Sequence, residues 1–220
     1  TIEVMNAMIK DEKIEFKNKL ISKKVNSPFK ISNNIEIEFI NVTHSTIQTV
    51  IMVFHTKEGS VMYANDFKID KNPTLGQETN FKRLIEIKPK ALICDCLYSN
   101  NPEKTPSEAT PQEELKKILF NHDLKGKKVF ITTFSSQIAR LNSIKKLARK
   151  LNRKVVFLGR SLAKYAFAAE NTGLVDFSDV EIVKYSSKGR KYLRNVKHPE
   201  KYLFVVTGHQ GEPRAMLSKI

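Results

Sequence analysis

Two residues, His44 and Asp66, have side chains that suit a divalent metal ion and lie where predicted strands end. Residues 35–42 are apolar at every second position, which predicts a strand before His44. Residues 50–56 and 61–63, joined through Gly59 at a tight turn, predict a hairpin before Asp66. Both side chains can then point into the same edge of one sheet. Taken alone, a His and an Asp at strand ends are more often turn or capping residues than ligands.

Three predicted turns, at 132–136, 159–161 and 207–212, have a composition that suits an anion such as phosphate. Each follows a strand and opens a helix, so amides, hydroxyls and a guanidinium would gather at the carboxyl edge of one sheet. Any one turn could merely cap a helix or reverse the chain, but three at one edge favour a binding site. The candidate contact residues are Ser135, Ser136, Arg160, Ser161, His209, Gln210 and Gly211.

A further cation, Arg140, lies one turn into a helix predicted at 136–151 and is well placed to meet a phosphate there. Four other cations of that helix lie opposite its apolar stripe, and we expect them to form a solvated face. They are Lys145, Lys146, Arg149 and Lys150.

The elements that must position these residues alternate in the second half of the chain. Strands are predicted at 127–133, 154–158, 180–183 and 202–206, and helices at 136–151, 162–170, partly at 184–197, and from 212 onward. Repeated β-then-α units indicate a doubly wound, mainly parallel sheet. A domain boundary is expected near residue 97.

Before that boundary we predict a helix at 1–12, a short helix around Phe81, Leu84 and Ile85, and a strand within 91–97. The run at 91–97 is continuously apolar apart from Asp95, which is typical of a strand covered on both faces. Two capping boxes, at 105–108 and 110–113, leave open which one starts the next helix.

The composition restricts the class of protein. The chain has 220 residues, 40% of them hydrophobic and 28% charged, which suffices for one sizeable core or two small ones. No apolar run is long enough to span a membrane, and no secretory leader is visible, so we expect no membrane partner. Cys94 and Cys96, the only cysteines, are expected to be buried reduced thiols, which fits a cytoplasmic location.

The positive charge of the chain is unevenly distributed. The formal net charge is +15, and residues 101–220 carry 24 Lys and Arg against 11 Asp and Glu. Residues 1–100 carry 14 against 12 and are nearly neutral. This asymmetry indicates that a polyanion docks on the second half.

The sequences of these motifs resemble those of a known family. Val42-Thr-His-Ser45, with Asp66-Phe-Lys-Ile-Asp70 following, resembles the third and fourth metal motifs of the metallo-β-lactamase superfamily. More narrowly, the chain resembles the β-CASP nucleases of the RNase J type, and residues 63–68 are closest to the archaeal members. The turns at 132–136, 158–161 and 207–213 resemble the β-CASP domain in the same order. Ser107, within Thr105-Pro-Ser-Glu108, falls in that family's conserved helix start, and Asp95 falls at its acidic motif.

The resemblance implies an α/β fold with part of a metallo-β-lactamase domain at 1–97 and a β-CASP domain at 98–220. It implies a zinc-dependent ribonuclease that degrades single-stranded RNA from the 5′ end. His44 would bind one zinc ion, Asp66 would bridge two, and Asp95 would support catalysis together with Asp66. Ser107, Arg140 and the turn residues named above would bind RNA phosphates. A cytoplasmic location is implied, and a homodimer is left open.

The superfamily's main metal motif, His-x-His-x-Asp-His, does not occur in this sequence. Both ends of the chain look cut, and we expect the given chain to be inactive on its own. Three alternatives stay open: a catalytically inactive RNA-binding module, an endonuclease of the RNA 3′-end-processing type, and a domain that binds a small phosphorylated metabolite.

Overall fold

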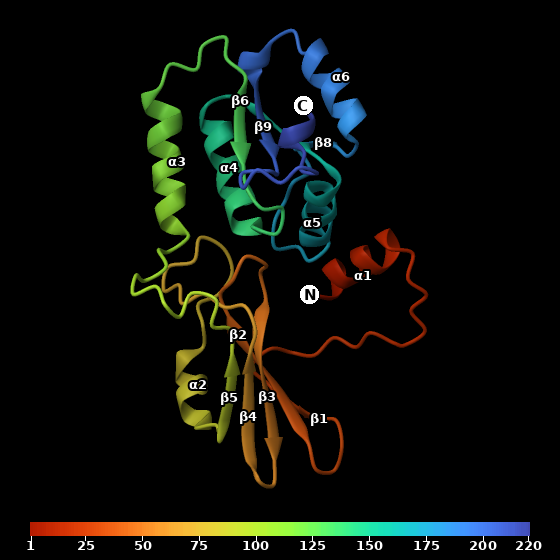
Figure 1. Ribbon diagram of the computed structural model, residues 1–220, viewed down its shortest axis with the longest axis vertical. Helices are drawn as coiled ribbons and strands as arrows, with labels where there is room; N and C mark the ends of the chain where they lie inside the picture. Colours follow the sequence, from red (N-terminus) through yellow and green to blue (C-terminus); the bar gives the residue numbers. More distant parts are fainter. The chain divides into compact units, whose positions relative to one another are not determined.

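The computed structural model describes residues 1–220, and the chain divides into two compact units (Figure 1). Thr1 and residues 17–110 form the first unit, and residues 2–16 and 111–220 form the second. The contacts therefore change at 110/111, whereas the sequence led us to place a boundary near residue 97. The assignment of 1–97 and 98–220 to two named domains stays a prediction.

The first unit is built on a five-stranded sheet in the order β1-β2-β3-β4-β5. Neighbouring strands are antiparallel except for β4 and β5, which are parallel. The strands are β1 (Pro28–Lys30), β2 (Glu36–Val42), β3 (Thr49–Thr56), β4 (Gly59–Ala64) and β5 (Ala91–Cys94), and one helix, α2 (Phe81–Ile87), lies between β4 and β5 in the chain.

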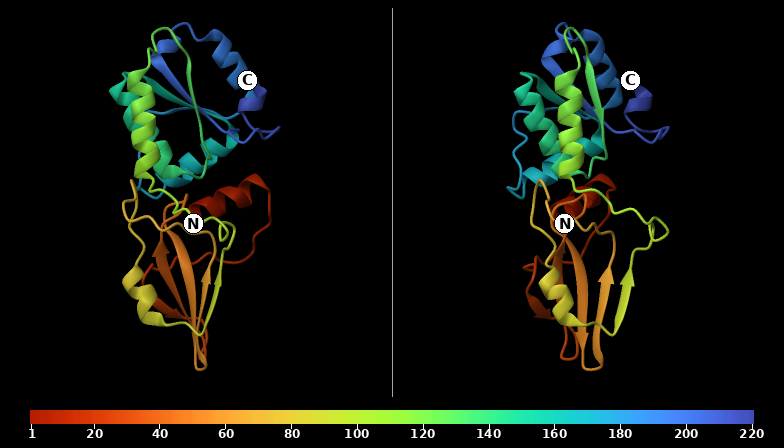
Figure 2. Two further views of the ribbon diagram at one scale, coloured as in Figure 1. Left: turned by 60° about the vertical axis from the view of Figure 1, so that its left-hand side comes forward. Right: turned by 90° about the vertical axis from the view of Figure 1, so that its left-hand side faces the viewer.

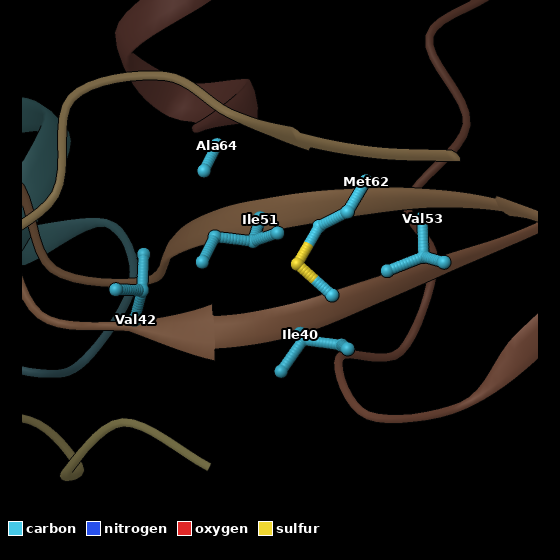
Figure 3. Close-up of a cluster of buried hydrophobic side chains, with 6 residues drawn as sticks. All are labelled: Ile40, Val42, Ile51, Val53, Met62 and Ala64. Carbon is cyan, nitrogen blue, oxygen red and sulfur yellow. The ribbon is translucent and has the colours of Figure 1, made fainter. Parts of the chain in front are cut away.

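One face of this sheet carries the first unit's apolar core, because alternate residues of a strand point to the same side. The buried side chains are Ile40, Val42, Ile51, Val53, Met62 and Ala64 (Figure 3). Leu84 and Ile87 of α2 pack against them, whereas Ile85 is 72% exposed. The short helix predicted around Phe81, Leu84 and Ile85 is thus present, but Ile87 rather than Ile85 belongs to its packed face.

The hairpin predicted around Gly59 is confirmed. Thr56 pairs with Gly59 across a two-residue loop, and Gly59 has φ +126°, a backbone conformation that favours glycine. α2 begins at an Asn80 cap that accepts a hydrogen bond from the Arg83 amide, and it ends at Lys88, immediately before Pro89.

Two expectations about β5 were wrong. All four of its residues are exposed, Leu92 to 57% and Ile93 to 56%, and Cys94 and Cys96 are exposed as well. β5 is the edge strand of this sheet and pairs only with β4. An apolar run predicts a strand, but its cover depends on neighbours that the run itself does not specify.

The second unit is a four-stranded, fully parallel sheet in the order β6-β9-β7-β8. Its strands are β6 (Val129–Thr132), β7 (Lys154–Leu158), β8 (Glu181–Val183) and β9 (Tyr202–Val206). Its α-helices are α1 (Ile2–Asp11), α3 (Ala109–Asn121, which starts in the first unit), α4 (Ile138–Lys150), α5 (Arg160–Glu170) and α6 (Ser186–Asn195), with 3-10 turns η1 (Pro199–Lys201) and η2 (Leu217–Lys219).

Helices lie on both sides of this parallel sheet (Figure 2). On one face, Val156, Leu158, Phe204 and Val206 pack with Leu193 of α6. The alternate residues of β7 and β9, also buried, point to the other face, and α4 and α5 contact β7. The predicted doubly wound α/β architecture is confirmed. None of the helices in the structure combines the length and apolarity needed to cross a membrane.

Three local predictions in the second unit need correction. Lys145 is not part of a solvated face, because it is 3% exposed and its ammonium lies 2.5 Å from Asp179. Residues from 212 onward form turns and η2 rather than an α-helix. α3 begins at Ala109, between the two capping boxes, so Pro111 is its third residue and not its first.

Candidate functional sites

Three candidate metal-binding or catalytic residues lie at one edge of the first sheet, which we call the metal edge. β2 and β4 are each antiparallel to β3, and β5 is parallel to β4, so β2, β4 and β5 end at the same edge. His44 and Asp66 each lie two residues past the end of a strand, and Asp95 directly follows β5. All three are exposed. The shared edge that the sequence predicted for His44 and Asp66 is thus present.

Backbone hydrogen bonds hold Asp95 beside the end of β4. Its amide donates to the carbonyl of Ala64 at 3.0 Å, and its Oδ1 accepts from the Leu97 amide at 3.0 Å. On the other strand end, the His44 Nδ1 lies 3.3 Å from the Ser45 hydroxyl. One carboxylate oxygen of Asp95 is therefore engaged in a turn.

The donor types at the metal edge fit a divalent metal, because imidazole and carboxylate are ordinary zinc ligands. The donor number falls short of a complete site. No three or more His, Cys, Asp or Glu residues of the structure gather in a group that could hold a metal ion. The chain supplies at most part of a ligand set.

Behind the metal edge, a buried carboxylate fixes the loop that follows Asp66. Asp70 is 2% exposed, and it accepts hydrogen bonds from the amides of Asn72 at 2.9 Å and Glu108 at 2.8 Å. Burial alone would raise the pKa of Asp70, but these amides, the Ser107 hydroxyl and Lys68 outweigh it and lower the pKa. The Thr43 hydroxyl donates to the Lys68 carbonyl and accepts from the Asp70 amide. Asp70 is thus a structural residue that the sequence alone did not single out.

Ser107, a predicted phosphate contact, belongs to the same scaffold. Its hydroxyl donates to the Asn72 carbonyl at 2.9 Å and accepts from the Ala109 amide at 3.2 Å at the start of α3. The same hydroxyl also helps to lower the pKa of Asp70, so Ser107 is engaged within the first unit.

In the second unit, the four strands also end at one edge because they are parallel. β6 and β9 are neighbours, and the Thr133 amide donates to the Val206 carbonyl at 3.1 Å. The rings of Phe134 and His209 meet edge to face at 4.3 Å. The turn that carries Ser135 and Ser136 therefore lies beside the turn that carries His209.

A cavity of about 430 Å³, which we call the anion pocket, lies at the ends of β7, β8 and β9. Two of the predicted phosphate contacts, Arg160 and Ser161, line it. Its other polar members were not among the predicted contacts. Lys184, Ser186, Ser187 and Thr207 closely follow β8 or β9, whereas Arg214 and Lys219 lie farther along the chain after β9.

The chemistry of the anion pocket suits a phosphate. No Asp or Glu is among its lining residues, and both α5 and α6 begin there, with their unpaired N-terminal amides. Gly159 opens α5 at φ +125° and ψ 156°, a conformation that essentially only glycine adopts. Asp11 is a nearby acid: its pKa is lowered by an ion pair with Lys164 at 3.0 Å and, more weakly, by Arg160 and Lys184.

The remaining predicted phosphate contacts are not among the lining residues of the anion pocket. They are Ser135, Ser136, Arg140, His209, Gln210 and Gly211. Gln210 already donates its amide to the Glu212 carboxylate at 3.0 Å, so an anion at that amide would meet a negative charge. The structure thus divides the predicted turns into the anion pocket and a neighbouring group around Phe134 and His209.

Comparisons with known proteins agree with this architecture. Residues 126–220 match the family model described as "Ribonuclease J, beta-CASP domain". Ribonuclease J of Pyrococcus abyssi is 37% identical over all of this chain and 50% of its own length, and that of Methanocaldococcus jannaschii is 36% identical over 100% and 51%. Ribonuclease J of Sinorhizobium meliloti is 33% identical over 84% and 31%.

A solved structure has the same fold over almost the whole chain. It is titled "Crystal Structure of a Protein of Unknown Function from Enterococcus faecalis V583", with a TM-score of 0.60 and 16% identity over 95% of this chain and 52% of that one. The chain spans about half the length of the archaeal relatives that it matches. Residues 126–220 are therefore a β-CASP domain of the ribonuclease J type, and the whole chain is similar to about half of each archaeal ribonuclease J.

Proposed function

We propose that this chain is part of a zinc-dependent ribonuclease that degrades single-stranded RNA from its 5′ end. The observation that carries the hydrolytic role is the shared metal edge of His44, Asp66 and Asp95. The β-CASP match at 126–220 and the similarity to proteins named ribonuclease J support a nuclease. Because the chain spans half of those relatives, the proposal concerns the complete protein.

His44 and Asp66 would hold zinc, together with ligands from outside this chain. When bound, zinc ions supply charge neutralisation at the attacked phosphate and make the attacking water more acidic. Asp95 would act as a positioning residue, because the Leu97 and Ala64 contacts fix it at the end of β5, beside β4.

The anion pocket would hold the 5′-terminal phosphate. Arg160 would give a charge-assisted contact, Ser161 and Ser186 would donate hydroxyl hydrogen bonds, and the first amides of α5 and α6 would complete the cradle. A chain end held there would fix the register of the RNA relative to the reacting bond.

The test of the hydrolytic role is Asp66→Ala in the complete protein. We expect loss of at least one zinc ion and a fall in RNA degradation by more than about a hundredfold, because even outer-shell partners of a metal typically cost 10–100-fold. Asp123→Ala, another exposed carboxylate, serves as the control. Full zinc content with normal turnover in Asp66→Ala would refute the assignment.

A further inference from the structure

A second cavity of the second unit, about 990 Å³ in volume, lies between β8, α6 and the start of β9, and we call it the lysine groove. Its cations are Lys184, Lys188, Lys191, Lys197, Lys201 and, when protonated, His198. No Asp or Glu is among its lining residues. The groove is therefore a concave surface with one sign of charge, which attracts a polyanion.

Two acids near this groove already have partners. Glu181 accepts a hydrogen bond from the Tyr192 hydroxyl at 2.8 Å and pairs with Lys154 at 3.5 Å. Glu200 lies 3.4 Å from the His198 ring. Neither forms an ion pair with a lysine of the groove, and Asp11, which interacts weakly with Lys184, is paired with Lys164. The positive charge of the groove therefore stays largely uncompensated.

Aromatic rings lie among these cations, and they divide into two kinds. Tyr192 and Tyr202 are half-buried and pack edge to face with ring centroids 6.4 Å apart, so they form part of the groove wall. Tyr185 is 55% exposed, and the Lys188 ammonium lies 5.8 Å from its ring centroid. An exposed ring flanked by cations is the arrangement on which an unpaired base stacks while lysines meet its phosphates.

The lysine groove and the anion pocket are continuous at two residues. Lys184 and Tyr185 line both of them. A chain whose terminal phosphate sits near Arg160 could therefore pass Tyr185 and continue along α6 without leaving positively charged surface.

The charge pattern decides between RNA and a second copy of this chain. Two copies that met through this face would bring together two sets of lysines with no carboxylate to pair them, and like charges across an interface are costly. A single strand of RNA brings the negative charge that the groove lacks, and its flat bases can stack on the exposed Tyr185 ring.

We propose that the lysine groove binds the segment of single-stranded RNA that follows the 5′-terminal nucleotide, with Tyr185 stacking on a base and Lys188 and Lys191 contacting phosphates. This inference rests on the proposed function, because it takes RNA as the ligand of the anion pocket. It adds a second contact region along α6 that would favour longer substrates.

The test compares RNA of two lengths, both with a 5′-monophosphate, binding to the complete protein in the presence of a chelator so that the RNA is not cut. Roughly 3 nucleotides would fill the anion pocket alone, and roughly 12 would extend along the groove, which is within the usual site sizes for single strands. The variants are Tyr185→Ala, Tyr185→Phe and the pair Lys188→Ala with Lys191→Ala.

Matched controls lie elsewhere on the second unit. Phe167→Ala removes another ring that is 62% exposed, and Lys116→Ala with Lys117→Ala removes two exposed charges from α3. Arg160→Ala tests the anion pocket itself. If this variant binds RNA of both lengths as tightly as wild type, the proposed function of the anion pocket is wrong.

We expect Tyr185→Ala to weaken binding of the longer RNA about tenfold, as for loss of one stacked base, and Tyr185→Phe to keep it. The double variant of Lys188 and Lys191 should bind the longer RNA more weakly. The magnitude of the log–log salt slope of that binding should fall by about 1.4, at roughly 0.7 per phosphate contact. Binding of the shorter RNA should not change. The controls should bind both lengths like wild type.

Equal binding of the longer RNA by these variants and the controls would overturn the groove proposal while leaving the anion pocket in place. A change of oligomeric state without a change in RNA affinity would also overturn it and assign the face to a second copy. Equal losses for a duplex RNA of the longer length would exclude base stacking on Tyr185.

Discussion

Arg160 is the charged one of the two predicted phosphate contacts that line the anion pocket, so its loss should alter recognition of the RNA end. In Arg160→Ala, degradation of 5′-monophosphate RNA should fall about ten- to a hundredfold relative to 5′-hydroxyl RNA, since a charge-assisted contact is worth roughly 1.5–3 kcal/mol. Zinc content should not change. Arg149→Ala, which removes a guanidinium 58% exposed on α4, is the control. An unchanged ratio in Arg160→Ala would exclude the anion pocket as the 5′ site.

Two serines separate the two groups of turns. Ser161 lines the anion pocket, whereas Ser136 lies in the turn beside Phe134 and His209. If the terminal phosphate occupies the anion pocket, Ser161→Ala should lower the preference for 5′-monophosphate about fivefold, as for loss of one hydrogen bond of about 1 kcal/mol, and Ser136→Ala should not. The measurement is the ratio of degradation rates on the two RNAs. The reverse result would move the phosphate to the turn that carries Ser136.

A buried ion pair in the first unit has a predictable energetic cost. Glu38 is 1% exposed and accepts two hydrogen bonds from the Arg83 guanidinium, each 2.8 Å long, while His55 lies 3.2 Å away. Arg83→Ala would leave that carboxylate buried without its main partner. We expect about 3 kcal/mol lower stability in urea unfolding, the low end of the usual range because the Arg83 side chain is 36% exposed. Lys116→Ala, which breaks a pair exposed on both sides, should cost under about 0.5 kcal/mol.

The same pair gives the stability of the first unit an acid dependence. The hydrogen bonds from Arg83 and His55 hold the pKa of Glu38 below its ordinary value despite burial. A carboxyl whose folded pKa is depressed stabilises the fold above its unfolded pKa, about 4.3, and this stabilisation is lost as the pH falls through the folded value. Between about pH 5 and pH 3, the free energy of unfolding should therefore depend less steeply on pH in Glu38→Gln than in wild type. Identical pH profiles would show that Glu38 does not carry this linkage.

At the scale of elements, periodicity identified the strands and their order of appearance well. The alternating run at 35–42 and the β-then-α units after Lys127 appear in the structure as predicted, because burial of one face imposes period 2 or 3.6 on the sequence. The failures concern what covers an element. The sequence predicts that β5 is buried, but it is an exposed edge strand. The sequence also predicts that Lys145 is solvated, but it is buried against Asp179. Both depend on contacts from distant residues that periodicity does not contain.

The candidate sites were predictable to the same degree. Position after a strand identified His44, Asp66, Arg160 and Ser161, since parallel strands place their ends at one edge. It could not show that Gln210 would give its amide to Glu212, nor that Arg214 and Lys219 would fold back to the anion pocket. Those contacts come from the path of the chain after β9, where no regular element constrains the sequence.

The turn that opens α5 depends on Gly159, so an alanine there should disturb the whole element. Its φ of +125° with ψ 156° is strained for any residue with a Cβ, at about 1–3 kcal/mol. Gly159→Ala should therefore lower the free energy of unfolding by up to about 3 kcal/mol. It should also weaken phosphate binding, because the first amides of α5 would shift. Gly126→Ala, at φ +67° with open space around it, should cost about 1 kcal/mol and leave phosphate binding intact. Urea unfolding and phosphate titration measure the two effects, and equal costs at both glycines would contradict this account.

At the scale of the whole molecule, the uneven charge predicts how RNA binding responds to salt. Residues 101–220 hold 24 of the 38 Lys and Arg, and the second unit contains both the anion pocket and the lysine groove. With about five phosphate contacts, the log–log slope for a single strand is roughly −3.5, so affinity should fall on the order of a hundredfold between 50 and 200 mM salt.

Replacing Lys184 and Lys219 of the anion pocket with alanine should reduce the magnitude of the slope by about 1.4. Replacing Lys57 and Lys82, two exposed lysines of the nearly neutral half, should leave it unchanged. Equal effects of the two pairs would mean that the charge acts only as a diffuse field, and a flat salt response would favour a small phosphorylated metabolite as the ligand instead of RNA.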